Sequence, residues 1–108
     1  MRFFGLKNCD TCRKALRALT EKGHAVEVVD VRADGVPRTD LDRFHAAFGA
    51  DIVNRRSTTW RTLSETERQG DPLELLERHP TLMKRPVIDV DGTLYLGWTD
   101  KVRAQLLT

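Results

Sequence analysis

The chain has 108 residues, of which 40% are hydrophobic and 31% are charged, and its formal net charge is only +2. This length and composition suit one folded domain with its own core, and they exclude a disordered or fibrous protein. Basic and acidic residues are interleaved along most of the chain, which excludes a basic nucleic-acid arm, so we expect no direct contact with nucleic acid.

The first 31 residues predict a strand, a helix and a second strand. Residues 1–4 form an apolar run that ends at Gly5, which is typical of an inner strand that enters a tight turn. Apolar residues recur at helical spacing over residues 10–22, and Gly23 is a plausible stop. Residues 24–31 alternate in polarity and are rich in β-branched side chains, so they predict a strand. This order is a βαβ unit with a right-handed crossover.

The middle of the chain, from about residue 38 to about residue 80, predicts helices inserted between two strand-containing parts. Thr39 is placed to cap a helix over residues 40–48, whereas residues 52–63 carry no clear period. Two further signals for a helix start follow, namely the capping-box spacing of Ser64 and Glu67 and the pair Asp71-Pro72.

The last part of the chain predicts a hairpin and a final helix. The run VIDVDGTLYLG has two alternating segments about the turn Asp91-Gly92, which is a strong hairpin signal. Thr99 is placed to cap the helix that follows. We therefore expect an α/β fold in one domain over residues 1–108, in which a βαβ unit and a ββα unit share a mixed four-stranded sheet.

Cys9 and Cys12 are the only cysteines, and they are three residues apart. No apolar run is long enough to span a bilayer and no leader pattern is evident, so we expect a cytoplasmic protein with no membrane contact. In that reducing compartment the pair is expected to be catalytic or metal-binding rather than a structural disulfide. Cys9 lies where the predicted helix begins, and unpaired N–H groups, together with Lys7, Arg13 and Lys14, would favour its thiolate.

Cys12 has two open interpretations. It falls one turn into the predicted helix on the apolar face, so it is either a resolving thiol or an inert, buried small hydrophobe. A zinc site would need about four ligands. The three histidines, at positions 24, 45 and 79, are scattered without ligand spacing, so we expect no metal.

Two other stretches carry candidate binding residues. Pro86 stands directly before a predicted strand, where a cis proline can expose backbone groups, and Arg85 beside it could grip a carboxylate or an oxyanion. The alternative is an ordinary proline at a strand start with a solvated arginine. Arg55 and Arg56, in the stretch RRSTTWR, could close over the same pocket or form a solvated charged turn.

Four segments together resemble the arsenate reductase (ArsC)/Spx family, and most closely its YffB-like branch. They are FGLKNCDTCRKAL, NRRSTTWRTL, KRP and DGTLYLGWTD, and the resemblance spans nearly the whole chain. It implies a thioredoxin-like fold with a helical insertion. It also implies that Cys9 is the nucleophile and that Arg85, before the cis-proline position Pro86, binds an oxyanion, with Lys7 and Asn8 as flanking candidates for substrate binding.

The resemblance implies a thiol oxidoreductase that holds no cofactor and uses glutathione as a co-substrate. Cys9 would attack a disulfide, a mixed disulfide or an oxyanion, and we expect a monomer. One alternative is an Spx-like redox-sensing regulator that binds RNA polymerase and uses the cysteine pair as a switch. The other is a true arsenate reductase. The family's arsenate enzymes use three arginines, but this chain has Asn54 near the first position and no arginine near Gly97-Trp98, which weighs against arsenate.

Overall fold

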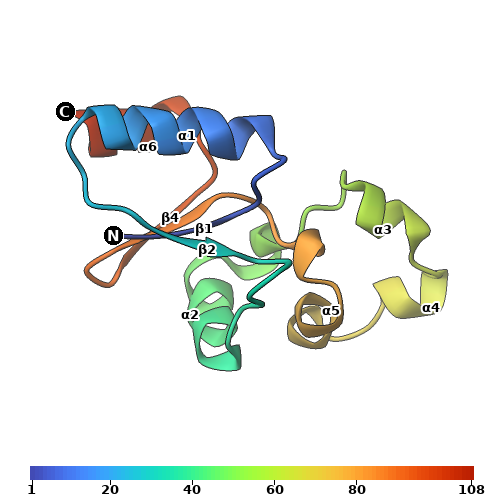
Figure 1. The fold of residues 1–108 in the computed structure, drawn as a ribbon. Helices are drawn as coiled ribbons and strands as arrows, with labels where there is room; N and C mark the ends of the chain where they lie inside the picture. The colour runs from blue at the N-terminus through green and yellow to red at the C-terminus, as the bar shows by residue number, and fades with distance from the viewer.

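The computed structural model describes residues 1–108 and contains a four-stranded sheet with helices on both faces (Figure 1). The strands are β1 (Arg2–Gly5), β2 (Glu27–Asp30), β3 (Val87–Val90) and β4 (Thr93–Leu96). Their order in the sheet is β2-β1-β3-β4. β1 is parallel to β2 and antiparallel to β3, and β3 is antiparallel to β4. The predicted mixed α/β sheet is therefore confirmed, with β1 as an inner strand.

The helices lie in two layers and one lateral extension. α1 (Asp10–Glu21) and α6 (Asp100–Leu107) cover one face of the sheet side by side (Figure 1). The helices between β2 and β3 are α2 (Arg38–Phe48), η1 (Gly49–Ile52, 3₁₀), α3 (Thr58–Thr62), α4 (Glu65–Arg68), α5 (Pro72–Arg78) and η2 (Pro80–Leu82, 3₁₀). Of these, α2 lies against the second face and α5 packs beside α2, while α3 and α4 extend to the side of the sheet. No helix has the length and apolar character that crossing a membrane requires.

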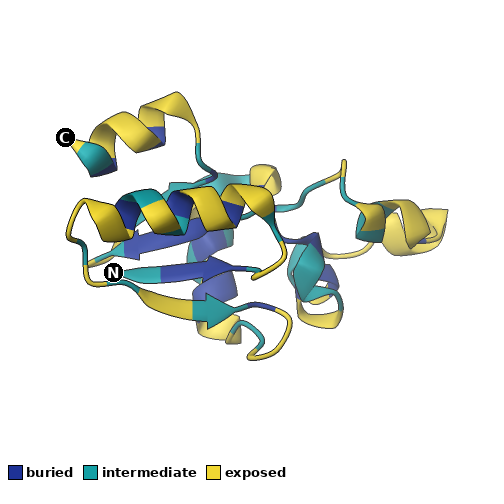
Figure 2. Ribbon diagram, turned by 45° about the horizontal axis from the view of Figure 1, so that its top comes forward, coloured by how far each residue is buried: buried dark blue, intermediate teal, exposed yellow.

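The alternation of side chains along the inner strands divides the core into two clusters. Phe3 and Ile88 point to the face covered by α1 and α6, where they pack with Leu19 among others. Phe4 points to the other face and meets Phe44 of α2 edge to face, with ring centroids 5.0 Å apart. β1 and β3 are thus buried on both faces, whereas the edge strand β2 is exposed over its first half and half-buried over its second (Figure 2).

Three of the predicted helix caps are present, and one predicted cap is wrong. The side chains of Ser64, Asp71 and Thr99 accept backbone hydrogen bonds at the starts of α4, α5 and α6. Thr39 does not cap α2, because the helix begins two residues earlier than predicted, at Arg38, with Pro37 at the N-cap position. The carbonyl of Pro37 accepts the N–H groups of Asp40 and Leu41, each at 3.0 Å, so Thr39 lies inside the first turn.

The predicted second strand is shorter in the structure than in the sequence analysis. The prediction covered residues 24–31, but only Glu27–Asp30 pair with β1. β1 has four residues, and its partners in register run from Arg2 opposite Glu27 to Gly5 opposite Asp30. β2 therefore ends where β1 offers no further residue to pair with it. The predicted hairpin turn at Asp91-Gly92 is confirmed, with φ values of 50° and 95°.

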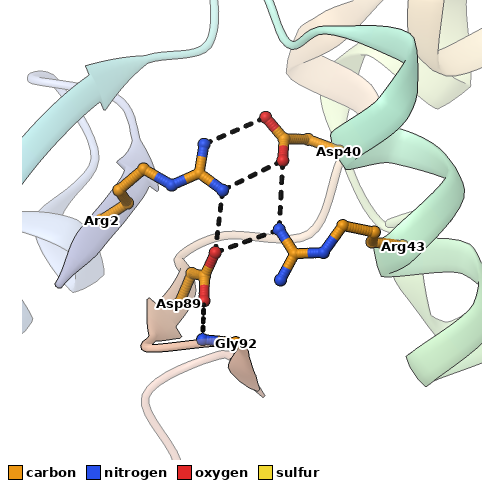
Figure 3. A network of polar contacts seen from close by, with 5 residues as sticks. All are labelled: Arg2, Asp40, Arg43, Asp89 and Gly92. Atoms are coloured by element: carbon orange, nitrogen blue, oxygen red, sulfur yellow. Dashed lines mark hydrogen bonds and ion pairs between the residues drawn. The ribbon is translucent and has the colours of Figure 1, made fainter.

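A network of four charged side chains ties the sheet to α2 (Figure 3). Arg2 of β1 donates to Asp89 of β3 at 2.8 Å and to both carboxylate oxygens of Asp40 at 3.0 and 3.1 Å. Arg43 of α2 bridges the same two carboxylates at 3.1 and 3.2 Å. Asp89 also accepts the N–H of Gly92 at 2.9 Å, which holds the hairpin turn. Both carboxylates are nearly buried, so each depends on these donors.

We predict that Asp89→Asn lowers the free energy of unfolding by about 2 kcal/mol in urea denaturation, because it removes two charge-assisted hydrogen bonds from a buried group. Asparagine can still accept the N–H of Gly92, so the turn should persist. Burial opposes ionisation of Asp89, but the hydrogen bonds from Arg43 and Arg2 outweigh it and lower its pKa. The difference from wild type should therefore be full above the unfolded pKa of Asp, about 3.9, and shrink as the pH falls through the lower folded pKa.

Asp42→Asn is the matched control for this experiment. Asp42 pairs with Arg38 on the exposed side of the same helix α2. A solvated pair of this kind contributes little to stability. Equal destabilisation by the two substitutions would contradict a special role for the buried network.

Candidate active site

A polar pocket of about 390 Å³ lies where β1 and β2 end and β3 begins. Its lining residues are Leu6, Lys7, Asn8, Cys9, Asp30, Arg32 and Arg85. The carboxyl ends of the parallel strands β1 and β2 meet at one edge of the sheet, and the antiparallel β3 starts at that edge. Three segments that are distant in sequence therefore converge on one hollow.

Cys9 stands at the N-cap position of α1. Its backbone is extended, with φ −92° and ψ 118°, and its carbonyl accepts the N–H of Arg13 at 2.9 Å as the helix begins. Its own N–H donates to the carbonyl of Leu6 at 3.3 Å, which closes the turn after β1. The side chain is half-buried and lines the pocket. The predicted position of Cys9 at the start of the helix is therefore observed.

The surroundings of Cys9 favour its thiolate. Burial raises the pKa of the Cys9 thiol, but the backbone N–H of Cys12, the Cys12 thiol and the Arg85 guanidinium together lower it below the ordinary value. The Cys9 side chain makes no full capping hydrogen bond, so the effect of the Cys12 N–H is an attraction at the positive end of the helix rather than a fixed cap. Arg13, which the sequence suggested as a source of positive charge, instead pairs with Asp10 on the surface.

Cys12 has the opposite character. It is 2% exposed and lies on the buried side of α1, in one core cluster with Ala15 and Leu19 of the same helix and Phe3 of β1. Burial, together with the nearby Cys9, raises the pKa of the Cys12 thiol to about 11. A Cβ placed on Gly5 would lie 2.9 Å from the Cys12 sulfur, so the strand approaches this thiol as closely as only glycine allows. Cys12 is therefore protonated at neutral pH, and its thiol helps to lower the pKa of Cys9.

Arg85 reaches the pocket from the segment before β3. The Arg85–Pro86 peptide bond is cis, and Pro86 is buried. The guanidinium donates to the carbonyl of Thr81 at 2.6 Å, and this contact orients the side chain. Its Nε atom is buried and has no hydrogen-bond partner. An arginine that keeps unused donors beside a thiolate can hold an anionic group of a bound molecule.

The structure brings together some predicted site residues and separates others. Lys7 and Asn8 line the pocket with Cys9 and Arg85. Arg55 and Arg56 instead line a second pocket of about 460 Å³, whose other lining residues are Ala50, Asp51, Val53, Asn54 and Lys84. The Arg55 guanidinium lies 5.7 Å from the centre of the half-buried Trp60 ring, and this contact turns it toward the helical segment.

Asp30 and Arg32 also line the Cys9 pocket, although neither was predicted as a site residue from the sequence. The signal was present, because residues that follow the second strand of a βαβ unit emerge at the same edge as those that follow the first. Asp30 is the last residue of β2, and Arg32 lies in the turn after it. Applying this rule to the predicted strand at residues 24–31 would have pointed to them.

Comparisons with known proteins agree with this architecture. The chain matches the ArsC family over residues 4–105. An uncharacterized protein of Haemophilus influenzae is 40% identical over 103 residues, which cover 91% of this chain and 90% of that protein. The global transcriptional regulator Spx of Streptococcus pneumoniae is 31% identical, and the match covers 92% of this chain and 80% of the regulator.

Solved structures give the same result. The YffB (PA3664) protein superposes with a TM-score of 0.91 at 32% identity, over 99% of this chain and 98% of that one. An arsenate reductase (ArsC) related protein from Brucella melitensis has a TM-score of 0.73 at 34% identity, over 95% of this chain and 91% of that one. These matches confirm the family resemblance and the thioredoxin-like fold class expected from the sequence.

We predict that Arg85→Gln raises the pKa of Cys9 toward that of an ordinary cysteine, because it removes the hydrogen bond and the charge that Arg85 supplies to the thiolate. The rate of Cys9 alkylation by iodoacetamide, followed against pH in a Cys12→Ser background, gives this pKa directly. Lys84→Gln is the control, since it removes the same charge one residue away at the second pocket. An unchanged midpoint in Arg85→Gln would contradict the assigned electrostatics.

Proposed function

The chain belongs to the ArsC family, and from this premise we propose that it is a thiol oxidoreductase with Cys9 as its nucleophile. The observation that carries the proposal is the half-buried Cys9 sulfur at the start of α1, where Cys12 and Arg85 lower its pKa. A lowered pKa increases the thiolate fraction of Cys9, and the thiolate is the nucleophile that thiol–disulfide exchange requires.

The proposed reaction begins with attack of the Cys9 thiolate on one sulfur of a disulfide. The S–S bond of the substrate breaks, a mixed disulfide forms on Cys9, and the leaving thiolate takes a proton from solvent. A second thiol then attacks the substrate-derived sulfur of the mixed disulfide, which breaks its bond to Cys9, frees the Cys9 thiolate and releases a disulfide between that sulfur and the external thiol. The first reduced thiol has already left in the first step, and a further external thiol that reduces the released disulfide completes the transfer of two electrons. Arg85 and the first N–H groups of α1 stabilise Cys9 as it leaves in this second step.

We propose that external glutathione, rather than Cys12, is the second thiol. Cys12 is buried, and its pKa of about 11 leaves little thiolate at neutral pH. The interaction with Cys9 that helps to raise the pKa of Cys12 would weaken once Cys9 is oxidised. Burial is the largest cause of the raised pKa, however, and burial would remain. A thiol that attacks well has a pKa near the ambient pH, which supports the external route. The protein needs no bound cofactor for this chemistry.

We predict that Cys9→Ser abolishes glutathione-dependent disulfide reduction, whereas Cys12→Ser retains most of it. The measurement is turnover of bis(2-hydroxyethyl) disulfide with glutathione as the reductant. Intact mass spectrometry after treatment with glutathione disulfide should find one glutathione on Cys9 in both the wild type and Cys12→Ser. An internal Cys9–Cys12 disulfide as the dominant oxidised form, with loss of turnover in Cys12→Ser, would show that Cys12 is the resolving thiol.

A second candidate function is an Spx-like redox regulator that contacts RNA polymerase. The similarity to Spx of Streptococcus pneumoniae and the Cys9–Cys12 spacing favour this alternative. It requires that RNA polymerase binds the purified protein and that oxidation of the cysteine pair changes this binding. Absence of binding in both redox states would eliminate the regulator.

Arsenate reduction is the third possibility, which the similarity to arsenate reductase-related structures raises. Asn54, near the expected position of one family arginine, lines the second pocket together with Arg55 and Arg56. The two arginines that line the Cys9 pocket are Arg32 and Arg85 instead. Glutathione oxidation that depends on added arsenate and is lost in Cys9→Ser would establish this activity.

A further inference from the structure

The turn after β2 forms part of the Cys9 pocket and is held by local hydrogen bonds. One carboxylate oxygen of Asp30 accepts the N–H groups of Arg32 and Ala33 at 2.9 and 3.0 Å. The N–H of Asp30 donates to the side chain of Asp34 at 3.0 Å, and the N–H of Asp34 donates back to the Asp30 carbonyl at 2.8 Å. These four hydrogen bonds fix the direction in which the turn presents Asp30 and Arg32 to the pocket.

The pocket contains charges of both signs. Asp30 is its only acidic lining residue, and Lys7, Arg32 and Arg85 are its cations. The N–H of Ala33, followed by that of Arg32, lowers the pKa of Asp30, so its carboxylate is ionised at neutral pH. Neither Lys7 nor Arg32 is within ion-pair distance of a protein carboxylate, although exposed arginines elsewhere, such as Arg17, are paired. The cations of this pocket are therefore available to a bound molecule.

This arrangement of charge selects among possible substrates of Cys9. A simple oxyanion would gain from the cations but would be repelled by Asp30. A molecule that carries an ammonium and a carboxylate on one carbon can satisfy Asp30 and Arg32 at the same time. The pocket volume of about 390 Å³ is in the range of pockets that bind small organic molecules.

We propose that Asp30 and Arg32 form a recognition subsite for the free amino-acid group of a low-molecular-weight thiol bound at Cys9. Arg32 binds the carboxylate of that group and Asp30 binds its ammonium, while Arg85 stays with the reacting sulfur. The inference rests on the proposed reaction at Cys9 and narrows its substrate class. Glutathione, through its γ-glutamyl end, and cysteine both carry this chemistry.

The test is a comparison of first-step rates at Cys9 with different disulfides. The measured quantity is release of the first equivalent of thiol from glutathione disulfide, cystine or the neutral bis(2-hydroxyethyl) disulfide. In Arg32→Gln the ratio of the rate with glutathione disulfide to that with the neutral disulfide should fall about 10-fold, because one charge-assisted hydrogen bond is lost. Arg78→Gln removes an exposed charge from the end of α5 and should keep the wild-type ratio.

Asp30→Asn tests the ammonium site. Asparagine keeps the oxygen that accepts the N–H groups of Arg32 and Ala33, so the turn is retained while the negative charge is removed. The wild type should react faster with glutathione disulfide than with its N-acetylated form, which lacks the ammonium. Asp30→Asn should lose this preference, and unchanged circular dichroism would confirm that the fold is intact.

The outcomes separate this inference from the proposed function. If Arg32→Gln and Asp30→Asn keep the wild-type preferences while Cys9 reacts with all disulfides, the subsite is wrong and the reaction stands. If Cys9 of the wild type reacts with none of them, the proposed reaction fails and the subsite fails with it. A loss in Arg32→Gln that is confined to glutathione disulfide identifies the tripeptide. An equal loss with cystine identifies an amino-acid disulfide more generally.

Discussion

The antiparallel pairing of β1 with β3 is the contact on which the candidate site depends. Phe4 lies opposite Val87 in this register, so the end of β1 and the start of β3 are neighbours at one edge of the sheet. Cys9 follows the first of these positions and Arg85 precedes the second. A slip of one residue would turn every side chain of β1 to the opposite face of the sheet. The ion network of Arg2 and Asp89 opposes such a slip at the other end of the pair.

The two cysteines show how position on a helix decides chemistry. Cys9 and Cys12 are separated by less than one turn, yet the first faces a polar pocket at the helix start and the second faces the apolar underside. The same helix therefore lowers the pKa of Cys9 and encloses Cys12, whose pKa is raised. This difference makes Cys9 the more acidic of the two thiols and therefore the better nucleophile.

The helical segment between β2 and β3 holds Arg85 in its place at the Cys9 pocket. Its bridge between Val53 and Met83, with the hydrogen bond from Lys84 to Ile52, fixes the chain just before Arg85. Within this segment, the carbonyl of Thr81 accepts a hydrogen bond from the Arg85 guanidinium. The segment thus shapes the pocket although none of its side chains between residues 38 and 82 lines it. Its own cationic pocket, at Arg55 and Arg56, is a separate feature.

The sequence by itself determined the local features, because caps, turns and periodicity act over a few residues. The Cys9 position at a helix start, the hairpin at Asp91-Gly92 and the caps at Ser64, Asp71 and Thr99 all follow from neighbouring residues. Only the tertiary structure decided that Asp30 and Arg32 join Cys9 and that Arg55 and Arg56 do not. Those outcomes depend on strand register and on how side chains from separate segments pack in space, which short-range patterns do not encode.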